Sequence, residues 1–151
     1  MNFREWSYPS TTPAAALWIR LATGGVFLSE GIQKFLFPLT LGVGRFARIG
    51  IPRPEILAPF VGSVEIVCGS LLIIGLLTRL STIPLLGVIT VAIGTTKILI
   101  LVHQGFWAMA HEARTDFAML CGLLYLLSAG PGSLSLDRYW ARPDPVSKDA
   151  R

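Results

Sequence analysis

Four long apolar stretches dominate this chain and restrict what it can fold into. They span residues 13–37, 54–77, 80–102 and 113–129. Each is close to the roughly 20 residues needed to cross the hydrocarbon core of a bilayer. Only 15% of the 151 residues are charged, whereas about 25% is usual in soluble domains. Because a backbone in lipid must satisfy its own hydrogen bonds, we expect a helix in every stretch.

The spacing of these stretches predicts an all-α fold, an integral membrane four-helix antiparallel bundle that forms a single domain, 1–151. Thr78 and Arg79 leave little room between the second and third helices, which must then be adjacent and antiparallel. An even number of spans places both termini on one side of the membrane. That side has a slight excess of basic residues, which favours cytoplasmic termini.

The remaining connections are polar or amphipathic. Residues 38–53 read PLTLGVGRFARIGIPR, a basic and amphipathic sequence that predicts an interfacial segment between helices 1 and 2. Residues 103–112 carry aromatic side chains between two histidines, which is typical of a membrane-interface belt. Residues 130–151 form a polar tail, in which Tyr139 and Trp140 are expected to rest on the headgroups.

Charged side chains inside the predicted helices give the strongest functional signal. A charge near the bilayer centre costs at least about 2.5 kcal/mol, so such residues normally face the protein interior and find partners. Six of the charged residues in the predicted helices form this signal, three basic and three acidic: Arg20, Lys34 and Lys97, with Glu30, Glu65 and Asp116. Arg114 borders the last helix and is expected to join them.

Helical spacing predicts that these charges converge. Steps of three and four residues place Arg20, Glu30 and Lys34 on one face of the first helix. Gly62 and Gly69 flank Glu65 on the second helix in the same way. Small residues beside a charge let neighbouring backbones approach closely. We therefore expect one graded cluster, with Glu65 near mid-membrane.

Two interpretations of this cluster stay open. In the first, the charges are ion pairs that hold the bundle together, with Glu30 on Lys34 and Lys97 on either Glu65 or Asp116. In the second, they form a ligand or proton-transfer site, because buried ionisable groups can be tuned toward neutral pH. This second interpretation assigns catalytic roles to three carboxylates and ligand binding to four cations: Glu30, Glu65 and Asp116, and Arg20, Lys34, Lys97 and Arg114.

Other chemistries have little support in the sequence. His103 and His111 lack a recognised metal-ligand spacing, and no metal site is predicted. Cys68 and Cys121 lie in apolar runs without a C-x-x-C motif, and their roles, like those of the histidines, stay open. No haem, flavin, zinc or nucleotide motif is recognised. The basic residues are scattered, so a nucleic-acid partner is not expected.

Several longer motifs resemble one family. The runs RLATGGVFLSEGIQKFLFP, GIPRP and VGSVEIVCGSLLIIGLLTRLSTIPLL, and the ending GPGSLSLDRYW, are similar to the DoxX family of small prokaryotic membrane proteins. The resemblance covers nearly the whole chain. It implies a four-helix bundle in the prokaryotic plasma (inner) membrane. It also implies a link to redox chemistry, since the family takes its name from a subunit of a thiosulfate:quinone oxidoreductase and other members are associated with quinone handling or oxidative stress.

The leading hypothesis is therefore a redox-linked membrane protein that binds a quinone-like molecule among its charged residues. Whether the chain is an enzyme by itself is left open. One alternative is a non-catalytic anchor that recruits a soluble redox partner protein. Another is a small transporter, which would need a homo-oligomer because four helices leave little room for a path.

Overall fold

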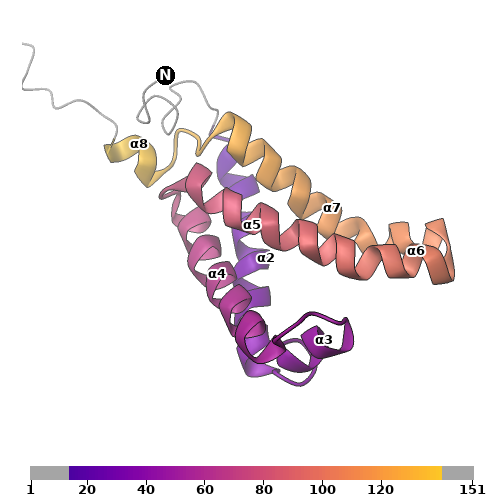
Figure 1. Ribbon diagram of the computed structural model, residues 1–151. Coiled ribbons are helices and arrows are strands. Elements are labelled where there is room, and N and C mark those ends of the chain that lie inside the picture. Colours follow the sequence, from indigo (N-terminus) through magenta and orange to yellow (C-terminus); the bar gives the residue numbers. More distant parts are fainter. Residues whose placement is uncertain (1–13, 141–151) are drawn as a thin grey trace, which may run out of the picture.

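The computed structural model describes residues 14–140, and this part of the chain is helical without any strand, which confirms the all-α prediction (Figure 1). The termini, including residues 141–151 of the predicted tail, lie outside the described residues. The helices, in chain order, are α2 (Ala16–Leu36), α3 (Val43–Arg48), α4 (Pro54–Ile74), α5 (Thr78–Ala92), the π-helix η1 (Ile93–Lys97), α6 (Ile98–Gln104), α7 (Phe106–Ala129) and α8 (Leu136–Trp140).

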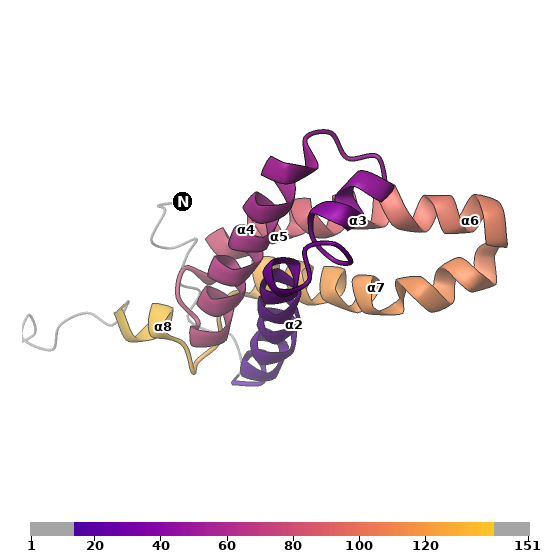
Figure 2. The same cartoon turned by 90° about the horizontal axis from the view of Figure 1, so that it is seen from below.

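The long helices form two hairpins that share one end. The α2 and α4 helices make one close antiparallel pair, and the continuous helix α5–η1–α6 pairs with α7 (Figures 1 and 2). The pairs meet where α4 turns into α5, around an apolar core that includes Phe27, Leu72, Leu85 and Leu126. They diverge from there, so the expected closed four-helix bundle is not confirmed.

Two elements differ from their predicted bounds. The fourth helix begins at Phe106 rather than 113, and the expected connection over 103–112 is wrong. Gly105 alone turns the chain, because its φ of +85° lies in the region that glycine adopts without steric cost. Of the described helices, Pro54–Ile74 and the continuous Thr78–Gln104 are long and apolar enough to cross a membrane by length and composition.

Four glycines explain why α2 and α4 pack so closely. A Cβ atom on Gly24 would lie 2.7 Å from the carbonyl oxygen of Gly69, and one on Gly31 would lie 2.7 Å from that of Gly62. The same seven-residue spacing on both antiparallel helices brings the two close approaches into register. The backbones therefore touch where no side chain intervenes, which is how helices associate in lipid. The sequence prediction for the Gly62 and Gly69 face is confirmed.

We expect Gly24→Ala to destabilise the protein by about 1 to 3 kcal/mol, the usual cost of forcing extra volume into a close-packed interface. Gly25→Ala is the matched control, because a Cβ there meets nothing within 4 Å. The control should leave stability unchanged or raise it slightly, since alanine is the better helix former. Thermal unfolding of the purified protein in detergent measures both. Equal unfolding temperatures for the two variants would contradict this account of the α2–α4 interface.

Candidate functional site

The structure divides the predicted site residues into separate groups instead of one cluster. Glu30, Lys34 and Glu65 meet between α2 and α4. Lys97 and Asp116 pair between η1 and α7. Arg20 lies near the other end of α2, against the segment that leads to α8. The expectation of a single graded cluster is wrong because the two hairpins diverge.

The first group is built around Lys34, and we call it the α2–α4 charge cluster: Glu30, Lys34, Glu65 and Arg45. The Lys34 ammonium nitrogen Nζ lies 2.6 Å from Oε2 of Glu65 and 3.9 Å from Oε2 of Glu30. The side chains of Lys34 and Glu65 are only 11% and 5% exposed, whereas that of Glu30 is 46% exposed. A buried acid is thus linked through one ammonium group to an acid that reaches the surface. The predicted ion pair between Glu30 and Lys34 is confirmed.

Local packing creates the room for this cluster. Gly62 lies one helical turn before Glu65, and a Cβ on it would lie 2.9 Å from Cε2 of Phe35 and 3.5 Å from Cβ of Lys34. The absence of a side chain at Gly62 lets Lys34 lie flat against α4 and reach Glu65. The short helix α3 adjoins the cluster as well, because it packs on α4 with Phe46 buried.

Arg45 of α3 is a member of this cluster that the sequence interpretation missed. It is half-buried and acts electrostatically on the Glu65 carboxylate, as Glu30 does with the opposite sign. With Arg45 the cluster contains two acids and two bases, so its formal charges balance. The RFAR sequence showed only that this segment is amphipathic and basic, and it did not indicate that one arginine turns inward.

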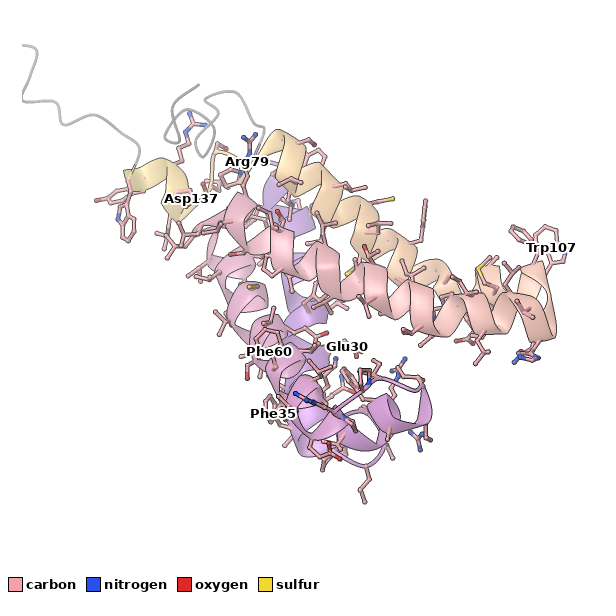
Figure 3. All side chains as sticks on the ribbon, in the orientation of Figure 1. Glu30, Phe35, Phe60, Arg79, Trp107 and Asp137 are labelled. Atoms are coloured by element: carbon pink, nitrogen blue, oxygen red, sulfur yellow. The ribbon has the colours of Figure 1, made fainter. Side chains whose placement is uncertain are left out.

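Aromatic side chains lie at the same end of the α2–α4 pair. Figure 3 shows Phe35 and Phe60 near Glu30, beside α3. Both rings are largely exposed. The exposed acid of the charge cluster, Glu30, and these two apolar rings therefore lie at the same end of the hairpin.

The second pair joins the two helices of the other hairpin. Nζ of Lys97 lies 2.9 Å from Oδ2 of Asp116, and both side chains are largely buried. The sequence left Lys97 with two possible partners, Glu65 and Asp116, and the structure pairs it with Asp116. Lys97 ends the π-helix, where Thr95 and Thr96 donate hydroxyl hydrogen bonds to backbone carbonyl oxygens one turn earlier. Such π-helical turns are rare and are frequently found at functional sites.

Arg114 does not join either acidic group. Its guanidinium donates a 2.7 Å hydrogen bond to the carbonyl oxygen of His111 on its own helix and is exposed. His103 and His111 are exposed as well, and both cysteines are free thiols. Within residues 14–140 no three histidine, cysteine or acidic side chains gather in a group that could hold a metal ion.

Arg20 belongs to a buried polar network that we call the C-terminal latch: Arg20, Asp137 and the backbone groups they bind. The Arg20 guanidinium donates to the carbonyl oxygens of Pro131 at 2.9 Å and Leu134 at 2.7 Å. The Asp137 carboxylate accepts from the backbone amides of Leu77 at 2.7 Å and Thr78 at 2.9 Å. Arg20 therefore holds the segment that places Asp137 at the start of α5. Figure 3 shows Asp137 at this corner of the molecule.

The latch corrects the prediction for the polar tail. Asp137 is 2% exposed, although it lies in the stretch from residue 130 onward that the sequence predicted to be a polar tail. Its two accepted hydrogen bonds satisfy amides that a helix N-terminus leaves without intrahelical partners. The sequence contains a signal for this role only in the acidic residue of the SLSLDRYW run, which composition alone assigns to solvent.

The all-helical fold, its apolar spans and its paired interior charges define a small helical membrane protein. The model of the DoxX family matches residues 15–104, and the chain belongs to this family. An uncharacterized membrane protein of Mycobacterium tuberculosis (strain ATCC 25618 / H37Rv) is 54% identical over 132 residues, which cover 83% of this chain and 81% of the relative. No solved structure matches the chain. The family match includes the whole α2–α4 charge cluster and Lys97, whereas Asp116 lies beyond it.

Proposed function

We propose that this protein binds a quinone-like molecule at the α2–α4 charge cluster and supplies protons for its reduction. The observation that carries the proposal is the contact between buried Lys34 and buried Glu65, with half-exposed Glu30 as the next acid outward. Reduction of a quinone to a quinol takes up two electrons and two protons. A cation and a chain of acids in a water-poor site meet the proton part of that demand.

Each residue has a distinct role in this proposal. Lys34 donates a hydrogen bond to the quinone oxygen on which negative charge develops during reduction. Glu65, once protonated, gives a proton to that oxygen and is reprotonated through Glu30, which exchanges protons with water. The second quinone oxygen takes its proton from water. Phe35, which lies against Gly62, flanks one face of the ring. Arg20, Lys97, Asp116 and Arg114 lie outside this site and are not assigned a role in it.

The electrons come from elsewhere in this proposal. A partner protein that carries a flavin, haem or iron–sulfur group reduces the quinone, and this chain binds it and delivers protons. We further propose that the protein is a multi-pass protein of a prokaryotic plasma membrane with cytoplasmic termini. The beginning of α2 and the α8 helix lie at the same end of the molecule, which supports placing both on one side (Figure 1).

Quinone binding by the purified protein tests the proposal. A short-chain benzoquinone and a naphthoquinone are titrated into wild type, Lys34→Met, Glu65→Gln and the control Glu55→Gln, an exposed acid on the same helix α4. Removal of a charge-assisted hydrogen bond costs about 1.5 to 3 kcal/mol, so Lys34→Met should weaken binding about tenfold to 100-fold. Glu55→Gln should bind like wild type. Binding that is absent in wild type, or equal in all four proteins, would overturn the proposal.

A further inference from the structure

The connection between α2 and α4 carries basic residues that the proposed quinone site does not use. Residues 38–53 contain three arginines and no acidic residue. Arg45 is half-buried and acts electrostatically on the Glu65 carboxylate, so it is counted with the charge cluster. Arg48 and Arg53 are exposed. The Arg48 guanidinium donates to the carbonyl oxygen of Thr40 at 2.9 Å through one nitrogen, and a guanidinium has further N–H groups to donate.

Large apolar side chains adjoin these arginines. Leu39 is 80% exposed, and its neighbours Leu36 and Phe37 at the end of α2 are also exposed. The connection is folded, because Phe46 is buried and the backbone amide of Ile51 donates to the carbonyl oxygen of Phe46 at 3.0 Å. The α3 helix lies at one end of the α2–α4 pair (Figures 1 and 2). This end therefore presents cationic and apolar groups together.

We propose that this surface, made of Leu36, Phe37, Leu39, Arg48 and Arg53, binds the phosphate of anionic phospholipid headgroups. The guanidinium group is planar and pairs with phosphate oxygens through two parallel hydrogen bonds, which a lysine ammonium cannot do. Apolar side chains beside such cations enter the boundary between headgroups and acyl chains. The proposal does not depend on quinone binding, because neither exposed arginine belongs to the α2–α4 charge cluster.

The combination of groups favours a lipid over an acidic protein as the partner. The carboxylates of an acidic protein would pair with the two arginines, but they would make no apolar contact with Leu39 and Phe37. A phospholipid supplies the anion and the acyl chains in one molecule. The surface also lies where α2 ends and α4 begins, which is the depth at which a membrane-spanning hairpin meets the headgroups.

Lipid retention by the full-length protein tests this proposal. The protein is purified in mixed micelles with equal amounts of phosphatidylglycerol and phosphatidylcholine, and bound lipids are counted by native mass spectrometry. Wild type should retain phosphatidylglycerol preferentially. An arginine near an anionic headgroup layer contributes about fivefold in affinity, so Arg48→Gln and Arg53→Gln should each lose about that factor and the double variant about 25-fold.

Two controls separate this effect from a general loss of positive charge or of folding. Arg138→Gln removes one positive charge at the opposite end of the molecule, on α8, and should keep the wild-type preference. Arg48→Lys with Arg53→Lys keeps the charge without the paired hydrogen bonds and should retain an intermediate preference. The proposal is overturned if wild type retains both lipids equally, or if the double glutamine variant and wild type show the same preference. An equal loss in Arg138→Gln overturns it as well.

Discussion

Replacement of Asp137 by alanine is expected to lower the stability of this protein by about 3 to 5 kcal/mol, the range seen when one partner of a buried ionic network is removed. The Asp137 carboxylate is buried and accepts hydrogen bonds from two backbone amides at the start of α5. It also acts electrostatically on Arg20, which is 1% exposed. The variant therefore leaves two backbone amides without their acceptor and removes the negative charge that acts on buried Arg20.

Thermal unfolding in detergent measures the effect. For a chain of this size, 1 kcal/mol corresponds to about 2 to 4 °C, so the unfolding temperature should fall by roughly 6 to 20 °C. Arg138→Ala is the neighbouring control and should change little, because Arg138 is only half-buried and its side chain lies outside the latch. Asp137→Asn keeps one acceptor oxygen and should fall between the two. An Asp137→Ala protein that unfolds at the wild-type temperature would show that the latch is dispensable.

The second large effect is expected at the α2–α4 charge cluster. Lys34→Met leaves the Glu65 carboxylate buried without its nearest cation, which lies 2.6 Å away in the wild type. We expect a loss of about 3 kcal/mol, at the low end of the range for broken buried pairs, because half-buried Arg45 still acts electrostatically on the acid. The measurement is chemical or thermal unfolding of the purified variant.

A double variant distinguishes a lost ion pair from lost packing. Lys34→Met combined with Glu65→Leu removes both charges and replaces them with apolar groups, a change that is often neutral or stabilising. It should be more stable than Lys34→Met alone. Arg48→Met serves as the surface control, since Arg48 is exposed on α3, and it should behave like wild type. If the double variant loses as much stability as Lys34→Met and Glu65→Leu lose separately when added together, the two side chains do not stabilise each other.

Much of the local structure could be predicted from the sequence. Apolar length located the α2 and α4 helices to within a few residues, and three- and four-residue steps correctly placed Glu30 beside Lys34. The glycine pattern around Glu65 correctly indicated a close helix contact. These features depend on spacing within one helix, which a single sequence contains directly.

The arrangement between helices could not be predicted in the same way. An assumed closed bundle predicted that Lys97 would join the charges of the first two helices in one cluster, whereas the divergence of the hairpins leaves Lys97 with Asp116. Periodicity within a helix carries no information about the angle between two hairpins. The length of α7 was missed because Gly105 makes a turn alone, where a longer connection was expected.

The latch was missed for a related reason. Asp137 follows a Gly-Pro-Gly sequence in a polar segment, and composition alone assigns such a residue to solvent. Its burial depends on Arg20, more than a hundred residues earlier, which binds the carbonyl oxygens of Pro131 and Leu134. Only the tertiary structure shows that a charge in the first long helix and an acid after the last one stabilise the same corner.

The most direct test of the proposed function is to identify the small molecules that co-purify with the protein from its own membrane. The full-length protein is purified gently and analysed by mass spectrometry and absorbance for bound small molecules, beside Lys34→Met and the control Glu55→Gln. The proposal predicts one quinone per chain in wild type and in Glu55→Gln, and its loss in Lys34→Met. A wild-type protein that contains no quinone, and that instead brings a soluble redox enzyme with it, would contradict the proposal and favour a membrane anchor.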